Sequence, residues 1–378
     1  MLIGVDMRTV FQASRRGTGK NLLDLYTTIA RRRPDWLFVM YHRNRQVDDP
    51  FADLANVESR FIDMPGDRWN LWQRVRLPLA ARAARVDVLH CPANTGPRHP
   101  LRPMVVTIHD LIPLDDRFGG PEAAAWERNV RRAVRKARRI VTPSETTRQM
   151  IVNRLGAPSD KVVVNHWAPD RGCQRVTDAD RLLRARQRYG LADDRPYVLG
   201  FGAADPRKNT RGVLTAWSQM SPSLRQGWQL LLVGISPSAM SDFERLREEL
   251  GIADSCVLSG FADEEDIPAL LSGAEVLCYP SLAEGFGLPI LDAMVCETAV
   301  LTSNVTSLPE VAGDAALLVD PEDVAAMTGG LAELLSNTAR RTELVERGRE
   351  RVRAFTWDAC ADRICEVFAA VADERANA

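Results

Sequence analysis

Residues 276–295 read VLCYPSLAEGFGLPILDAMV: an apolar run, then a glycine-rich turn, then a helical pattern. The opening residues predict a strand with two apolar faces, and we expect a helix to begin near Gly287. Gly285 and Gly287 allow the backbone to approach a ligand, and the helix start offers N–H groups and a positive dipole end. The junction therefore predicts a phosphate site, with the Glu284 carboxylate placed to accept hydrogen bonds from ligand hydroxyls. The alternative is a glycine-rich turn that only caps a helix.

The same alternation of strand and helix extends over almost the whole chain. Seven strands are predicted in the first half and six in the second, which indicates an α/β protein with doubly wound parallel sheets. Proline and glycine mark a boundary, so we expect an N-terminal domain at 1–168, a linker at 169–195 and a C-terminal domain at 196–356. The final helix, at about 357–378, is expected to pack back on the N-terminal domain. Such sheets bind ligands at the carboxyl ends of their strands, so two facing domains predict a site in the cleft between them.

Composition excludes several other classes of protein. The chain has 378 residues, of which 45% are hydrophobic and 26% charged, as in a globular protein of two domains. No apolar run is long enough for a membrane helix, and the N-terminus lacks the apolar core of a signal peptide. The seven cysteines are scattered without a C-x-x-C pair, so we interpret them as reduced thiols of a cytoplasmic protein.

The net charge of −1 hides an uneven distribution. Residues 1–190 hold 34 Lys+Arg and 20 Asp+Glu, whereas residues 191–378 hold 15 and 30. The basic half predicts an anionic partner, and we expect peripheral contact with an anionic membrane rather than nucleic acid, because no nucleic-acid-binding module is present. The alternative is a set of solvated helix faces. The side chains expected to form this surface are Arg31–Arg33, Trp69, Trp72, Arg74, Arg76, Arg128, Arg131, Arg132, Arg135, Lys136, Arg138 and Arg139.

Four more segments extend the pattern of residues 284–292. They are Phe201-Gly-Ala-Ala-Asp-Pro-Arg-Lys-Asn209, Val257-Leu-Ser-Gly-Phe261, Ser303-Asn-Val-Thr-Ser-Leu-Pro-Glu-Val-Ala-Gly313 and Thr107-Ile-His-Asp-Leu-Ile-Pro113. Together they closely resemble the retaining glycosyltransferases of family 4, which have the GT-B fold of two Rossmann-like domains facing a cleft. The resemblance covers nearly the whole chain and is specific for the family rather than for the substrate.

The resemblance implies roles for individual residues. As catalytic residues, Glu284 would contact the donor sugar, Lys208 would neutralise the departing diphosphate, and His109 would lie near the sugar. The N–H groups of residues 286–288 would hold the diphosphate, and a glycine loop at 17–19 would approach donor and acceptor. The implied donor-binding residues are Arg207, Gly285, Phe286, Gly287, Leu288, Asp292, Phe261, Gly17 and Gly19.

Two positions depart from the family pattern. The second glutamate of the signature, which in the family binds the ribose, is Asp292 here, one methylene shorter. The arginine that often follows the glycine of the phosphate loop is replaced by Ala203, so phosphate binding is expected to depend more on Lys208 and Arg207. Neither change predicts loss of activity.

The resemblance is nearest to bacterial mannosyltransferases of cell-surface polysaccharide assembly. It implies retaining transfer of a hexose from a nucleotide sugar, with GDP-mannose as the preferred donor, to a glycan or lipid-diphosphate-linked acceptor at the inner face of the cell membrane. No cofactor or metal is expected: Asp178-Ala-Asp180 starts a polar helix and suits a cap, and the five histidines lack metal-ligand spacing. The alternatives are a UDP-glucose- or dTDP-rhamnose-dependent transferase, a nucleotide-sugar epimerase, or a non-catalytic nucleotide-sugar-binding subunit.

Overall fold

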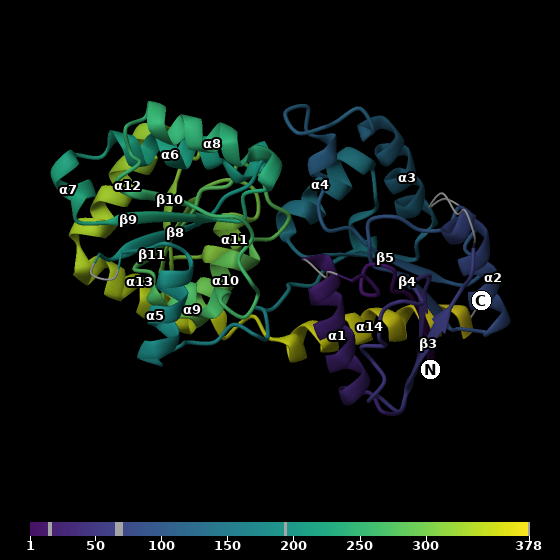
Figure 1. Ribbon diagram of the computed structural model, residues 1–378. Helices are drawn as coiled ribbons and strands as arrows, with labels where there is room; N and C mark the ends of the chain where they lie inside the picture. Colours follow the sequence, from purple (N-terminus) through teal and green to yellow (C-terminus); the bar gives the residue numbers. More distant parts are fainter. Residues whose placement is uncertain (14–16, 65–70, 193–194, 377–378) are drawn as a thin grey trace. The chain divides into compact units, whose positions relative to one another are not determined.

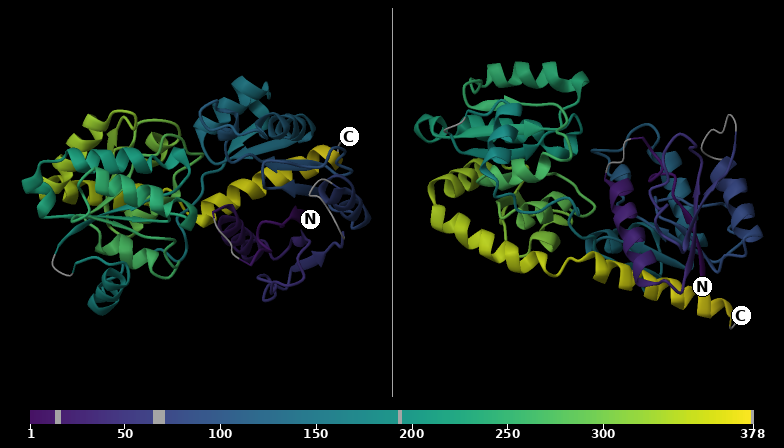
Figure 2. Two further views of the ribbon diagram at one scale, coloured as in Figure 1. Left: turned by 45° about the horizontal axis from the view of Figure 1, so that its top comes forward. Right: turned by 60° about the horizontal axis from the view of Figure 1, so that its bottom comes forward.

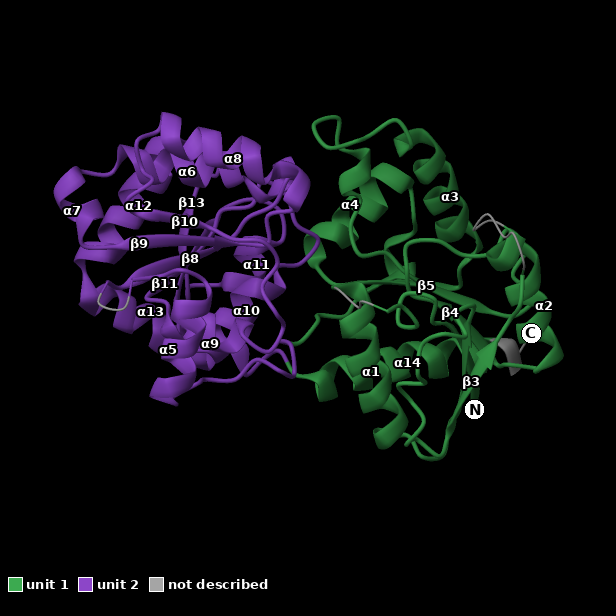
Figure 3. Cartoon of the chain, viewed as in Figure 1, with its two compact units in different colours: residues 1–168, 356–378 green, residues 169–355 purple. Residues whose placement is uncertain are grey.

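The chain folds as two compact units, each built around one sheet (Figure 3). The computed structural model describes residues 1–13, 17–64, 71–192 and 195–376. The first unit comprises Met1–Ala168 and Thr356–Ala378, and the second comprises Pro169–Phe355. Both sheets are parallel, with helices between most successive strands, so the predicted pair of Rossmann-like folds is confirmed.

The first unit holds a seven-stranded sheet in the order β3-β2-β1-β4-β5-β6-β7. Its strands are β1 (Leu2–Asp6), β2 (Leu37–His42), β3 (Val57–Phe61), β4 (Val88–Cys91), β5 (Met104–Thr107), β6 (Arg139–Thr142) and β7 (Val162–Val164). Its helical segments are α1 (Thr18–Arg32), a π-helical turn η1 (Trp72–Arg76), α2 (Leu77–Ala83), η2 (Ile112–Leu114), α3 (Ala123–Lys136), α4 (Glu145–Leu155), η3 (Ser159–Lys161) and α14 (Trp357–Ala376). Helix α14 lies against α1, as all views show (Figures 1 and 2).

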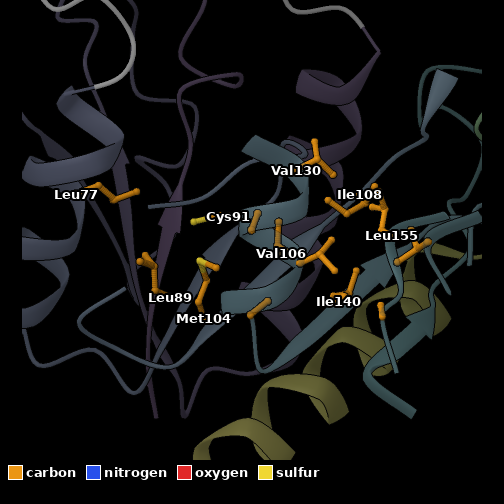
Figure 4. Close-up of a cluster of buried hydrophobic side chains, with 14 of the residues drawn as sticks. Leu77, Leu89, Cys91, Met104, Val106, Ile108, Val130, Ile140 and Leu155 are labelled. Carbon is orange, nitrogen blue, oxygen red and sulfur yellow. The ribbon is translucent and has the colours of Figure 1, made fainter. Parts of the chain in front are cut away.

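The core of the first unit explains why these segments adopt this order. Strand side chains such as Leu89, Val106 and Ile140 are fully buried and pack against Leu77 of α2 and Val130 of α3 (Figure 4). Burying a side chain of this size contributes about 1.5–3 kcal/mol. The apolar faces of these helices therefore cover the sheet, and the polar residues described below follow the ends of its strands.

The second unit holds a six-stranded sheet in the order β10-β9-β8-β11-β12-β13. Its strands are β8 (Tyr197–Phe201), β9 (Gln229–Val233), β10 (Cys256–Leu258), β11 (Val276–Tyr279), β12 (Ala299–Ser303) and β13 (Leu317–Val319). Its helical segments are α5 (Ala179–Arg188), η4 (Pro206–Lys208), α6 (Thr210–Gln219), α7 (Pro222–Gln226), α8 (Pro237–Glu249), α9 (Ile267–Gly273), α10 (Leu288–Val295), α11 (Leu308–Ala312), α12 (Val324–Ser336) and α13 (Thr338–Val352). Helices α6 and α8 cover one face of the sheet, and α9 and α10 cover the other (Figure 1).

The stretch 169–195, expected as a linker, is part of the second unit. Helix α5 packs against α9, with Ala185 and Tyr189 buried. The Tyr189 hydroxyl donates to Asp266 Oδ2 at 3.0 Å, and Arg188 pairs with the same carboxylate at 2.9 Å. The arginines of α5 therefore belong to the acidic unit, which reduces the charge asymmetry to a balance of +8 for the first unit and −9 for the second.

Two further observations concern the chain as a whole. Within the described ranges, none of the helices is both long and apolar enough to cross a membrane. The seven cysteines are free thiols, and six of them are buried, including Cys91, Cys256 and Cys278 in strands.

Candidate functional site

The centre of the second unit's site is a hydrogen-bonded cluster of Lys208, Tyr279 and Glu284. Tyr279 ends β11, Glu284 follows it in the loop before α10, and Lys208 ends the short η4 turn after β8. Lys208 Nζ donates to Glu284 Oε1 at 2.6 Å and to the Tyr279 hydroxyl at 2.7 Å, and that hydroxyl donates to the same Glu284 oxygen at 2.7 Å. Strands β8 and β11 are neighbours in the sheet, which is why residues 76 positions apart meet.

The electrostatics of this cluster keep the lysine charged. Burial by itself opposes the ammonium form, but Tyr279 and the Glu284 carboxylate outweigh it and raise the pKa of Lys208. Burial, and then the Glu284 carboxylate, raises the pKa of Tyr279, so its hydroxyl keeps its proton. The Lys208 side chain still exposes 26% of its surface. The protein thus holds a permanent, reachable cation at the carboxyl edge of the sheet.

The turn after Glu284 is stabilised by hydrogen bonds from the junction between β12 and α11. The Ser307 hydroxyl donates to the carbonyl oxygens of Glu284 and Phe286 at 2.9 and 2.8 Å, and Glu284 N–H donates to Thr306 Oγ1 at 3.2 Å. Gly287 has a φ of 122°, and a Cβ there would lie 2.7 Å from Leu308 Cδ2. A side chain at Gly287 is therefore excluded by both the backbone and the packing. As predicted, α10 begins directly after this glycine, at Leu288.

The phosphate loop predicted at 201–209 is built around polar contacts. Arg207 pairs with Asp205 at 2.5 Å, which holds its guanidinium against its own turn. Asn209 has a φ of 54°, in the left-handed region, and its Nδ2 donates to the carbonyl oxygens of Pro280 and Pro321 at 3.1 and 2.8 Å. The Asn209 side chain thus ties the end of β8 to the loops that follow β11 and β13.

The remaining donor residues predicted in the second unit lie in two environments. Asp292 is on α10, and its Oδ1 accepts a hydrogen bond from the backbone N–H of Asp170 at 2.9 Å. Phe261 follows β10 and exposes 52% of its surface, which is unusual for a phenylalanine and suits a stacking surface for a ring. Phe286 is buried and packs edge-on against Phe355, so only its backbone is suited to meet a ligand.

His109 of the first unit is held in a fixed orientation after β5. Its Nε2 lies 2.6 Å from the Pro92 carbonyl oxygen, which can only accept, so Nε2 carries the proton and Nδ1 is an acceptor. Burial lowers the pKa of His109, although the hydrogen bond to Pro92 opposes the shift. The ring stacks on Trp167 with centroids 5.8 Å apart, and the His109 N–H donates to Asn94 Oδ1 at 2.7 Å.

The glycine loop at the start of α1 leaves room beside the backbone. Gly17 has a φ of 46°, and a Cβ there would meet no atom of the described residues within 4 Å. Gly19 is buried in the first turn of α1. Arg15 and Arg16, which precede this loop in the sequence, lie outside the described residues.

Comparison with known proteins places this geometry in a family. Residues 15–168 match the family model described as glycosyltransferase family 4, and residues 183–351 match the one described as glycosyl transferases group 1. The O-antigen chain mannosyltransferase B of Escherichia coli is 32% identical over 273 residues, which are 71% of each chain. The chain belongs to glycosyltransferase family 4.

One more relative and one solved structure show how far the likeness of the glycosyltransferase to known proteins extends. The serotype-specific mannosyltransferase WbdA of Escherichia coli is 29% identical over 270 residues, which are 70% of this chain but only 33% of WbdA. The solved structure of a sucrose-phosphate synthase from Thermosynechococcus elongatus has a TM-score of 0.77 at 21% identity, with 98% of both chains covered. The latter likeness supports the GT-B fold alone.

Several residues of the glycosyltransferase's site were not anticipated from the sequence. Tyr279 was predicted only as part of a strand, although its polar group at a strand end was a usable signal. Asn94 and Asn209 both have left-handed backbones, with φ of 60° and 54°. Asparagine is one of the few residues that adopt this conformation readily, but a sequence does not show which asparagines do so.

The basic aromatic surface predicted on the glycosyltransferase is only partly formed. Trp72 is fully buried, and its indole N–H donates to the Ile62 carbonyl oxygen at 3.1 Å, so it cannot reach a membrane. Its place in the predicted surface was therefore wrong, because the π-helical turn η1 directs it into the core. Trp69 lies outside the described residues. Arg128, Arg135 and Arg138, on or just after α3, are exposed.

Proposed function

We propose that this glycosyltransferase transfers mannose from GDP-mannose to a hydroxyl of a glycan or lipid-linked oligosaccharide, with retention at the anomeric carbon and without a metal. The Lys208–Glu284–Tyr279 cluster carries the proposal. It supplies a fixed cation and a hydrogen-bond-accepting carboxylate next to a glycine turn and a helix start, as a departing diphosphate and its sugar require. The mannosyltransferases among the relatives favour mannose as the sugar.

In the proposed mechanism, the bond between the anomeric carbon and the diphosphate oxygen breaks while the acceptor oxygen attacks from the same face. The leaving phosphate oxygen takes the acceptor's proton, so no protein base is required. Lys208 and the N–H groups at 286–288 stabilise the negative charge that develops on the diphosphate. Before the donor binds, Glu284 neutralises Lys208. When the diphosphate binds, it becomes the lysine's partner and frees Glu284 to accept hydrogen bonds from sugar hydroxyls.

The other predicted residues take supporting roles in this proposal. Arg207 adds positive charge beside the diphosphate, Asp292 accepts a hydrogen bond from the ribose, and the exposed ring of Phe261 contacts the base. His109 contacts the transferred sugar through its backbone carbonyl or its neutral ring, and the glycine loop at 17–19 approaches donor and acceptor. A double displacement through Glu284 is the alternative route to retention.

The competing functions differ in measurable ways. A UDP-glucose- or dTDP-rhamnose-dependent transferase keeps the reaction and changes the donor. A nucleotide-sugar epimerase releases sugar and nucleotide without an acceptor. A non-catalytic subunit binds the donor and transfers nothing.

A thermal-shift screen of GDP-mannose, UDP-glucose and dTDP-rhamnose, followed by transfer assays with EDTA and NMR of the product's anomeric proton, separates these functions. We expect stabilisation by GDP-mannose above the others, EDTA-resistant transfer and an α-linked product. An inverted product or loss of transfer in EDTA would contradict the mechanism. Absence of stabilisation by every nucleotide sugar would refute the proposed function.

We also propose that the exposed arginines on and after α3 contact an anionic membrane, because each basic side chain near such a surface contributes about 1 kcal/mol. Flotation with vesicles of neutral lipid, and of neutral lipid with anionic lipid, tests this contact. Binding only to the anionic vesicles is expected, and equal recovery with both would remove the membrane from the proposal.

A further inference from the structure

The first unit contains a polar pocket that none of the roles above uses. The pocket has a volume of about 140 Å³. Its walls come from the end of β1, from η1, from the loop after β4 and from α3. A water molecule takes about 30 Å³ of liquid, so the pocket has room for a group of several heavy atoms.

Four arginines line the pocket, and among the described residues only one of them, Arg8, is paired with a carboxylate. Arg8 forms a buried ion pair with Asp6 at 2.7 Å and stacks over the Trp72 ring at 4.6 Å, so it belongs to the frame of the pocket. Arg74, Arg98 and Arg132 also line it. Over the ranges that the structure describes, no carboxylate pairs with these three, and Arg132 donates only to Asn129 Oδ1, at 3.2 Å.

Arg74 and Arg98 are close enough to Arg132 to repel its positive charge. Burial, followed by the charges of Arg98 and Arg74, lowers the pKa of Arg132. Like charges held together without a counter-ion raise the free energy of the empty pocket, and an anion that enters relieves this repulsion. Planar guanidinium groups are also the side chains best suited to hold phosphate oxygens in pairs.

A hydroxyl group in the pocket wall also lacks a partner. Thr9 lines the pocket, and its Oγ1 is buried without a hydrogen bond among the described residues. A buried hydroxyl without a partner costs free energy, and a native protein usually provides one. A ligand oxygen in the pocket would accept the Thr9 proton. Another part of the wall is fixed, because Gln73 Nε2 donates to Asp6 Oδ2 at 3.1 Å.

The pocket is joined to His109 by a single loop. Pro92 and Asn94 of this loop hold the His109 ring and backbone, at 2.6 and 2.7 Å. The pocket is lined by other residues of the same loop, namely Ala93, Thr95 and Gly96. An anion in the pocket therefore lies within one loop of the histidine that we place beside the transferred sugar.

We propose that this pocket binds a phosphate or diphosphate group of the acceptor substrate. The inference rests on the proposed function, since only a transferase has an acceptor. The two possible sources of the group are a lipid diphosphate and a soluble sugar phosphate, which present the same oxygens to Arg74, Arg98, Arg132 and Thr9. The group would anchor the acceptor while its glycan hydroxyl extends toward His109.

Pyrophosphate binding tests the pocket without any transfer reaction. Because pyrophosphate is also expected to bind at Lys208, the titrations are made by calorimetry in the Lys208→Ala protein. The pocket variant carries Arg98→Gln and Arg132→Gln. The control carries Arg82→Gln and Arg85→Gln, which are exposed, lie on or just after α2 outside the pocket, and change the net charge equally.

We expect the pocket variant to weaken pyrophosphate binding at least tenfold, and the control to change it less than twofold. Equal weakening of pyrophosphate binding in the pocket variant and the control would overturn the proposal. So would an absence of pyrophosphate binding to the Lys208→Ala protein itself. Thr9→Val provides a second variant that keeps every charge, and a threefold or greater loss is expected there. Circular dichroism and the Tm of each variant identify any that fail to fold, in which case the Thr9→Val titration decides.

Transfer assays distinguish the two sources of the anion. The acceptors are an unphosphorylated glycoside, the same glycan as a soluble 1-phosphate, and the same glycan on a short-chain lipid diphosphate. For these assays the Arg98→Gln and Arg132→Gln changes are made in the protein that keeps Lys208. They should raise KM at least tenfold for one or both phosphorylated acceptors, with little change in kcat or in the KM for the glycoside. An equal rise with the glycoside would exclude the pocket as an anion site. If neither the unmodified protein nor any variant binds a nucleotide sugar, the proposed function is refuted, whereas the result of the pyrophosphate titration still stands.

Discussion

The two units carry their functional residues in different ways, although both are Rossmann-like. The site of the second unit is drawn from short contiguous segments, 205–209 and 279–292, on neighbouring strands. The residues around His109 in the first unit come from separate segments, because Pro92 and Asn94 lie in the loop after β4 and Trp167 follows β7. A phosphate loop needs glycines and a helix start, which are local, whereas a pocket of side chains depends on which strand ends lie together.

One device is nevertheless common to both units. A left-handed asparagine stands at the carboxyl edge of each sheet, and its side chain fastens a neighbouring connection. Asn209 donates to two carbonyl oxygens, and Asn94 accepts from the His109 N–H. In the second unit, Asn209 connects the loops that follow three strands. In the first unit, Asn94 holds the backbone of His109 in place.

Replacement of Lys208 by alanine should have the largest effect, because it removes the cation that we propose binds the diphosphate. We expect kcat/KM to fall by about 10²–10³, as for removal of one group that stabilises charge in a transition state. The measurement is steady-state transfer with donor affinity by calorimetry. Arg211→Ala, an exposed cation on α6, is the control and should stay near the parent. A Lys208→Ala protein with unchanged donor affinity would remove Lys208 from this role.

Substitution of Asn209 and of Asn94 tests whether the two units depend equally on a left-handed asparagine. Asn209→Ala should cost about 2–3 kcal/mol of unfolding free energy, because it strains the backbone and leaves two carbonyl oxygens without their donor. Asn94→Ala should cost about 1–2 kcal/mol of unfolding free energy. It should reduce kcat more than Asn209→Ala does, because the His109 N–H loses its hydrogen-bond acceptor. Urea unfolding and transfer rates check both. Glycine at each position restores the backbone, so equal stability of the alanine and glycine variants would show that strain plays no part.

Acid should destabilise the first unit before the second, because all five histidines lie in residues 1–168. Burial lowers the pKa of His90 to about 3. The unfolded chain therefore binds a proton there below about pH 6.5 that the folded unit does not, and stability falls by up to about 1.4 kcal/mol per pH unit as the pH decreases toward 3. Urea unfolding from pH 7 to 5 measures this slope. His90→Gln should flatten it, and an unchanged slope would contradict the assignment.

Asp292→Glu should have the smallest effect, although it restores the residue that the family signature carries. The longer side chain gains reach toward a ribose but loses the hydrogen bond to the Asp170 N–H at 2.9 Å. Each of these changes is about 1 kcal/mol, so we expect the donor KM to change by less than about fivefold. A gain of tenfold or more would show that the shorter aspartate limits donor binding in this protein.

Much of the fold was predictable, because its signals are local. The seven and six strands were predicted, and α10 begins directly after Gly287, close to the start that the glycine turn predicts. The short helices α7 and α11 were missed, because five residues are too few to show a period. The polar face of α5 suggested a linker, and only its contacts with Asp263 and Asp266 show why it packs on the second unit.

The sequence by itself determined the family, the two parallel sheets and the glycine turn at 285–287, because periodicity and backbone freedom are properties of neighbouring residues. The tertiary structure decided which groups meet. It paired Lys208 with Glu284 and Tyr279, buried Trp72, fixed the tautomer of His109 and gathered Arg74, Arg98 and Arg132 around one pocket. These contacts join residues far apart in the chain, so they depend on the order of strands in a sheet, which no short segment encodes.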